Sequence, residues 1–102
     1  MATLVESLYP KGTLVELFSG EVAIVVAPSN ANKLRPTVIL ILDGDKQPYP
    51  FRKWVNLASP MWEINNQPPP TITHVLPDGS YDINISAILS EEFSHTNNEL
   101  TP

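Results

Sequence analysis

The side chains of this sequence that could bind or transform a small molecule are few and lie far apart in the chain. Its two arginines, Arg35 and Arg52, carry forked donors that would suit an anionic group such as a phosphate. Asp43 and Asp45 flank a glycine and could supply oxygen ligands to a hard cation, but no acidic residues follow at the spacing of a calcium loop. This pattern favours a plain turn over a metal site.

The two histidines, His74 and His95, have no partner motif in the sequence. His74 falls within an expected strand, where a lone histidine is more often structural or solvent-facing than a proton carrier. The chain has no cysteine, so it offers neither a disulfide nor a thiolate metal site. We therefore expect no catalytic residue, no metal site and no cofactor in this chain.

Large apolar side chains gather between residues 49 and 62 and could form a contact surface. In a small barrel such residues more often cap an open end, so we favour a core role, with a protein interface as the main alternative. Leu4 and Leu8 would form an apolar stripe on an N-terminal helix, and that stripe needs a covering surface. The candidate interface residues are Leu4, Leu8, Tyr49, Phe51, Trp54 and Trp62.

Length and charge limit the class of protein. With 102 residues the chain can bury one core, and a content of 42% hydrophobic against 17% charged residues is typical of a globular domain. The formal charge of −5 would repel a phosphate backbone, so we expect no nucleic acid partner. The sequence has neither a membrane-length apolar stretch nor a signal peptide pattern, which predicts a soluble chain without membrane insertion. The lack of cysteine is compatible with the cytoplasmic location that we expect.

Alternating and apolar runs predict five strands. Residues 13–18 and 21–26 are β-prone and are joined by Ser19 and Gly20, which predicts a tight hairpin with Gly20 at positive φ. Residues 37–42 are apolar on both faces and predict a central strand that is covered on both sides. Shorter strands are expected at residues 54–57 and 71–75, separated by proline-rich connections.

Two short helices are expected outside these strands. The first covers residues 2–9, and the second follows the Pro77-Asp78-Gly79 turn, with Asn84 or Asp82 as its cap. The sequence therefore predicts a mainly β fold, a small five-stranded bent sheet or SH3-like barrel with a short helix at each end. Residues 94–102 are expected to be a frayed tail.

Several short motifs follow one another along the chain. They are Tyr9-Pro10-x-Gly12-Thr-Leu-Val15, Leu17-x-Ser19-Gly20-Glu21-Val-Ala, Leu34-Arg35-Pro36-x-Val38, Leu40-x-Leu42-Asp43, Leu76-Pro-Asp-Gly-Ser-Tyr81 and the region Ile83–Leu89. Their order is more specific than any one of them. It resembles the segment that follows the catalytic domain in many HD-GYP cyclic di-GMP phosphodiesterases, and the resemblance covers roughly residues 4–90.

The resemblance implies a noncatalytic C-terminal module, because the family's His-Asp pair and Gly-Tyr-Pro signature are absent from this sequence. Residues 1–9 would then end a helix of the preceding catalytic domain, and residues 10–93 would form the β domain. The implied partners are that catalytic domain, which the module would stabilise or modulate, and a second copy in a homodimer. The alternative is a regulatory barrel that senses a nucleotide or small anion through Arg35, Arg52 and the aromatic cluster.

Overall fold

The computed structural model describes residues 8–29 and 32–100, with side chains as far as Phe93. Strands predominate in this part of the chain, as the sequence predicts, and the predicted N-terminal helix lies almost entirely outside it. The elements are β1 (Leu14–Leu17), β2 (Val22–Ala27), β3 (Thr37–Leu42), β4 (Pro48–Asn56), α1 (Met61–Ile64), β5 (Ile72–Leu76), the 3₁₀ turn η1 (Ser80–Asp82) and α2 (Ile85–Leu100).

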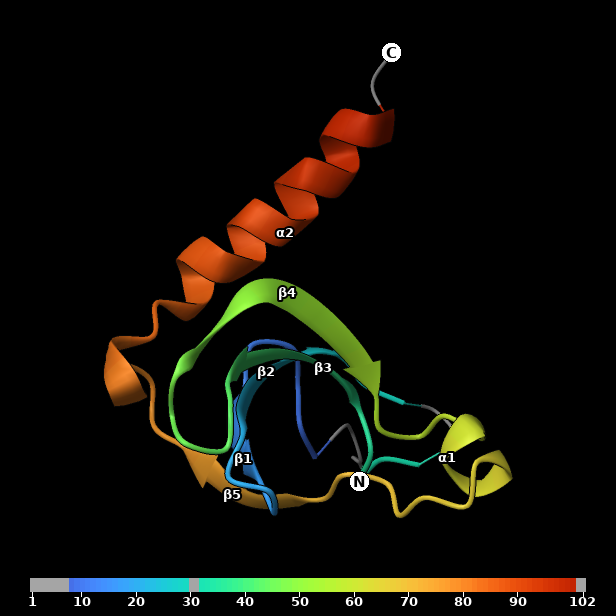
Figure 1. The fold of residues 1–102 in the computed structure, drawn as a ribbon. Helices are drawn as coiled ribbons and strands as arrows, with labels where there is room; N and C mark the ends of the chain where they lie inside the picture. The colour runs from blue at the N-terminus through green and yellow to red at the C-terminus, as the bar shows by residue number, and fades with distance from the viewer. Residues whose placement is uncertain (1–7, 30–31, 101–102) are drawn as a thin grey trace, which may run out of the picture.

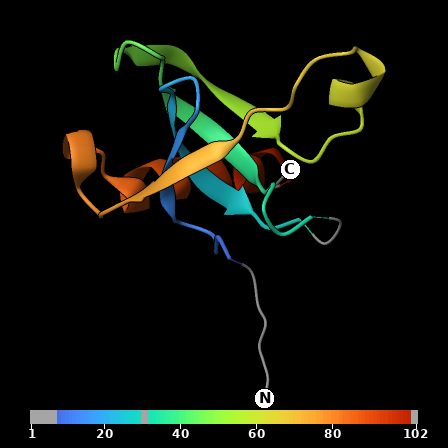
Figure 2. The ribbon, with the colours of Figure 1, turned by 90° about the horizontal axis from the view of Figure 1, so that it is seen from below.

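The five strands form one antiparallel sheet in the order β4-β3-β2-β1-β5. The sheet is strongly bent, and α2 runs along its outer side next to β4 (Figures 1 and 2). β4 and β5 are the two edges, so the sheet stays open. The prediction of a mainly β, five-stranded bent sheet is confirmed.

The hairpin between β1 and β2 forms where the sequence predicts it. The Gly20 N–H donates to the Leu17 carbonyl (2.8 Å), and the Leu17 N–H donates to the Glu21 carbonyl (2.8 Å). Gly20 has a φ of +92°, the left-handed value that ends a three-residue hairpin loop. Phe18 belongs to this loop and not to the strand, which leaves its ring 84% exposed.

Strands β2 and β3 are buried on both faces, which confirms the prediction for residues 37–42. One face of the sheet packs under α2, where Ile24 and Ile39 contact a core that includes Ile88 and Leu89. The other face has its own core around Val25, Val38 and Leu57 and is partly covered by Tyr9, Tyr49, Val55 and Ile72. Continuous apolar runs are what a strand needs when both of its faces are covered.

The expected fourth strand, residues 54–57, was placed too narrowly. β4 begins at Pro48 and also contains Pro50, which the sequence reading had put in a connection. Proline lacks a backbone donor, and an edge strand tolerates it because only one of its sides must pair. The register between β3 and β4 also shifts between Leu40 and Leu42, where Leu42 faces Pro48.

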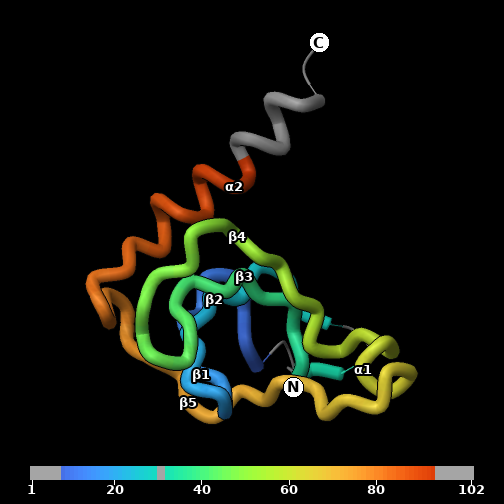
Figure 3. The backbone as a smooth tube through the Cα atoms, in the orientation of Figure 1, coloured from blue at the N-terminus to red at the C-terminus, as the bar shows by residue number. Residues whose placement is uncertain are grey.

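The C-terminal helix is capped as the sequence suggests. The Asn84 side-chain oxygen accepts the Ala87 N–H at 2.9 Å, so Asn84 and not Asp82 caps α2. The backbone of α2 continues to Leu100, past the boundary at residue 93 that was expected for the β domain (Figure 1). Figure 3 shows the first part of α2 running beside β4. α1 was not predicted. It is a single turn in the connection between β4 and β5.

Candidate functional site

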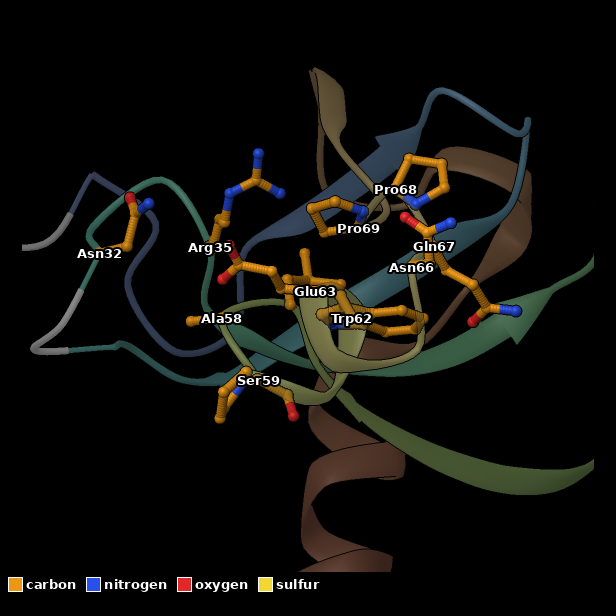
Figure 4. A pocket seen from close by; sticks show the side chains of 12 residues that line it. Asn32, Arg35, Ala58, Ser59, Trp62, Glu63, Asn66, Gln67, Pro68 and Pro69 are labelled. Atoms are coloured by element: carbon orange, nitrogen blue, oxygen red, sulfur yellow. The ribbon is translucent and has the colours of Figure 1, made fainter.

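A hollow lies among the described residues at the end of the sheet where α1 sits. It has a volume of about 660 Å³ and is enclosed by two connections, one before β3 and one between β4 and β5 (Figure 4). A pocket of this size is within the range that holds a small organic ligand. Its lining residues are Asn32, Arg35, Leu57, Ala58, Ser59, Pro60, Trp62, Glu63, Asn66, Gln67, Pro68 and Pro69.

Trp62 is fixed in this pocket by two hydrogen bonds. Its indole Nε1 donates to the Asn56 carbonyl (3.0 Å), and its own carbonyl accepts the Gln67 N–H (2.8 Å). Trp62 also borders a second hollow of about 450 Å³ on the inner face of β4, which includes Val55 and Met61. Trp62 is therefore a rigid aromatic wall shared by both hollows.

Arg35 reaches the same pocket from the connection before β3. Its guanidinium Nη1 donates to the Pro70 carbonyl (3.4 Å), which links the two connections that enclose the pocket. The backbone on either side of it is also fixed. The Arg35 N–H donates to the Asn32 carbonyl (3.0 Å), and the buried Pro36 accepts the Leu57 N–H (3.2 Å). Arg35 thus lines a pocket whose walls are held by hydrogen bonds.

Arg52 occupies a different place. It lies beside α2, 3.8 Å from a Glu91 oxygen and 3.9 Å from a Glu92 oxygen, in a shallow hollow that does not include Arg35. Trp54 donates from Nε1 to the same Glu92 (2.9 Å) and meets the Phe93 ring edge-on, with the ring centroids 5.9 Å apart. These contacts attach α2 to β4. The two arginines that the sequence proposed as one anion site are not brought together.

The aromatic cluster is divided in the same way. Tyr49 packs against the core around Val25 and Val38, and its hydroxyl donates to the Glu21 carboxylate. The Phe51 ring is 58% exposed, and its centroid lies 6.3 Å from that of Tyr49. Of the residues proposed as an interface, Leu8 is 61% exposed and Leu4 lies outside the described residues. Of the proposed interface residues that the structure describes, Trp62 lines the pocket that contains Arg35.

At the opposite end of the sheet, Glu16 forms an ion pair with Lys46 (2.8 Å) and lies 3.7 Å from His74. The hydrogen bond from Lys46 lowers the pKa of Glu16, against an opposing effect of burial, and the same bond raises the pKa of Lys46. The hydrogen bond to Glu21, together with burial, raises the pKa of Tyr49 to about 12.

The Asp43-Gly44-Asp45 segment is the turn that the sequence favours. The Asp43 carboxylate accepts the N–H groups of Asp45 (2.8 Å) and Gln47 (3.0 Å), so its oxygens stabilise the turn between β3 and β4. Across the described residues no three metal-ligating side chains are grouped to hold an ion. No helix in that part of the chain has the length and apolar character to cross a membrane.

Several pocket residues were missed from the sequence. Glu63, Asn66 and Gln67 line the pocket only because α1 turns the chain back on itself, and the bond from Asn66 N–H to the Glu63 carbonyl (3.0 Å) closes that turn. A four-residue helix leaves too little periodicity to be found. Trp62 and the triple proline were the available signals, because rigid residues around an aromatic side chain favour a preformed hollow.

No protein-family model matches the sequence, and the searches among curated proteins and among solved structures find no match either.

Proposed function

We propose that this chain is a noncatalytic module of an HD-GYP-type cyclic di-GMP phosphodiesterase, and that it holds and modulates the neighbouring catalytic domain. The proposal rests on the resemblance in sequence. It is supported by the fact that the motifs carrying that resemblance have structural roles in this fold, which is what an accessory module without its own chemistry requires.

The turn at residues 9–13 is the observation that carries the proposal. Tyr9 packs against the core around Val25 and Val38. The Pro10 carbonyl accepts hydrogen bonds from both the N–H (3.1 Å) and the hydroxyl (2.7 Å) of Thr13. Gly12 has a φ of +96°, and its N–H donates to the Val25 carbonyl (2.8 Å). The Tyr-Pro-x-Gly-Thr motif thus fixes the direction in which the chain enters β1, and a rigid joint can transmit the position of a neighbouring domain.

Two of the other motifs contain turns. The Ser80 hydroxyl donates to the Pro77 carbonyl (2.7 Å) after Gly79 at a φ of +87°. Ser19 donates to Glu21 (2.8 Å) beside Gly20. A pattern of turn residues specifies an architecture and not an active site.

The proposal predicts that the chain acts on an HD-GYP catalytic domain supplied in trans. We expect a complex by calorimetry and a changed rate of cyclic di-GMP hydrolysis, whereas the chain alone shows no turnover and no stoichiometric iron, manganese or zinc. Leu8→Asp, next to the joint, should weaken the complex about tenfold, because charging an apolar contact costs on the order of 1.4 kcal/mol or more.

Phe18→Asp is the matched control, since Phe18 is exposed at the other end of β1 and its change should leave the complex intact. Absence of any complex with HD-GYP catalytic domains from several bacteria would overturn the proposal. Equal weakening by both variants would show that the joint is not the contact.

A further inference from the structure

We propose that the pocket beside α1 binds a purine ribonucleotide, with the base on Trp62, the ribose hydroxyls at Glu63 and the phosphate at Arg35. This inference goes beyond the proposed function, because a module that only holds a neighbouring domain needs no ligand.

The charges in the pocket are the first argument. Among the described residues, neither Arg35 nor Glu63 has an ion-pair partner, whereas Arg52, Lys46 and Glu16 are all paired. Arg35 is half-buried and carries five N–H donors, of which the bond to the Pro70 carbonyl engages Nη1. A guanidinium held in a hollow with donors to spare suits a phosphate, which it can bind through two parallel bonds.

The order of the side chains is the second argument. Figure 4 shows Arg35 at one side of the pocket, the Trp62 indole at the other, and the Glu63 carboxylate between them, extended toward Arg35. A nucleotide has the same order of parts, namely an anionic phosphate, a ribose with two hydroxyl donors, and an aromatic base. A carboxylate accepts ribose hydroxyls, and an indole face stacks with any base.

The rigidity of the walls is the third argument. Pro60, Pro68 and Pro69 restrict the connection between β4 and β5, and the Gln67 N–H holds the end of that turn through the Trp62 carbonyl. A preformed site binds with a smaller loss of conformational entropy than a loop that must order itself. The amide groups of Asn66 and Gln67 border the Trp62 side and can bond to the edge of a base.

The size of the pocket argues for a nucleotide over a smaller anion. About 660 Å³ is far more than an inorganic phosphate fills, and the polar groups are spread over the whole lining. Glu63 also disfavours a bare anion, because its carboxylate repels a phosphate that lies close to it. The pocket therefore selects for a ligand that carries donors beside its anionic group.

The test is a titration of the full chain with AMP and with GMP, followed through the two tryptophan indole N–H signals in NMR spectra. We expect saturable shifts of the Trp62 signal, while Trp54, which is bonded to Glu92 beside α2, serves as the internal control. Inorganic phosphate and adenosine alone should each bind at least tenfold more weakly. Free tryptophan, which also combines a ring, an anion and a donor, should bind more weakly than AMP.

Two pairs of variants make the test specific. Arg35→Gln should weaken AMP binding at least tenfold, and the matched Arg52→Gln should change it less than twofold. The chain should prefer AMP to its 2′-deoxy form by about fivefold, and Glu63→Gln should abolish this preference. A thermal melt of each variant shows whether it is folded.

The proposal is overturned if neither nucleotide gives a saturable shift at Trp62, if inorganic phosphate binds as well as AMP, or if both arginine variants weaken binding equally. Tighter binding of tryptophan than of AMP would assign the pocket to an amino acid and would overturn the nucleotide as well. None of these results depends on whether the chain binds a catalytic domain.

Discussion

The two ends of the sheet use charge in opposite ways. At the end with the β1–β2 and β3–β4 turns, Lys46 pairs with Glu16 and Tyr49 donates to Glu21. At the end with α1, Arg35 and Glu63 share a hollow without an ion-pair partner among the described residues. Paired charges contribute to stability, whereas unpaired charges in a hollow remain available to a ligand. The first end is therefore the closed end, and the second is the open end.

The closed end is also more tightly packed. A Cβ at Gly20 would lie 3.0 Å from the Gly44 carbonyl oxygen, and a Cβ at Gly44 would lie 2.9 Å from the Ser19 carbonyl oxygen. The two turns thus contact each other backbone to backbone, and the Lys46 ammonium donates to the Gly20 carbonyl (2.6 Å) across that contact. Little change in sequence can be accommodated there.

Gly20→Val should have the largest effect on stability. It combines strain at a φ of +92° with the contact against Gly44, so we expect a loss of about 3 kcal/mol in the free energy of unfolding. Gly79→Val is the control for strain alone, because Gly79 has a φ of +87° and no atom within 4 Å of an added Cβ. It should cost about 1 kcal/mol.

Urea titrations of the two variants decide this prediction. Equal losses would show that the contact between the turns contributes nothing, and the closed end would then differ from other turns only in its backbone angles.

Tyr49→Phe should have the next largest effect, a loss of about 1 kcal/mol at neutral pH, because it removes a hydrogen bond to a carboxylate. The pKa of Tyr49 is raised from 10.0 to about 12, so its hydroxyl is held protonated in the folded state. That stabilisation is present below pH 10 and is lost as the pH rises toward 12.

The unfolding free energy of the parent chain should therefore fall between pH 10 and pH 12 more steeply than that of Tyr49→Phe. Parallel alkaline profiles for the two proteins would show that the Tyr49 hydroxyl is not held by Glu21.

The contrast between the ends also explains what the sequence could predict. The hairpin at Gly20, the doubly covered β3 and the cap at Asn84 depend on neighbours within four residues, so local patterns were sufficient. The pocket is lined by the residues before β3 and by those around α1, which are about thirty positions apart in the sequence. No local sequence pattern indicates that these two segments lie together. Arg35 was found because arginine is rare in this chain, whereas Glu63 carried no signal.

The extent of β4 was missed for a related reason. Pro48 and Pro50 indicate a connection when they are read locally, and only the place of β4 at the edge of the sheet makes them acceptable in a strand. Arg52 was proposed as a ligand-binding residue because its forked donors suit an anion. No local pattern connects it with Glu91 and Glu92, which lie on a helix about forty residues further on.

Glu16→Gln should have a smaller effect, a loss of about 0.5 kcal/mol at neutral pH, because solvent screens an ion pair that is partly exposed. The hydrogen bond from Lys46 lowers the pKa of Glu16 below its usual 4.5. The contribution of the pair is therefore present above pH 4.5 and is lost as the pH falls through the lowered value. Melts at pH 7 and pH 3 measure this, and a difference between the two proteins that is as large at pH 3 as at pH 7 would contradict it.

The smallest effects should come from the open end. Arg35→Gln and Glu63→Gln should each change the free energy of unfolding by less than about 0.5 kcal/mol, as substitutions of exposed or half-exposed side chains usually do. The bond that Arg35 loses is a long one, 3.4 Å to the Pro70 carbonyl, and Glu63 has no side-chain partner to lose among the described residues. Neither substitution removes a short hydrogen bond to a carboxylate, in contrast to Tyr49→Phe, which removes the donor to the Glu21 carboxylate. Urea titrations at pH 7 provide the measurement. A loss above 1 kcal/mol for either variant would place that charge among the stabilising groups and would remove the distinction between a closed and an open end.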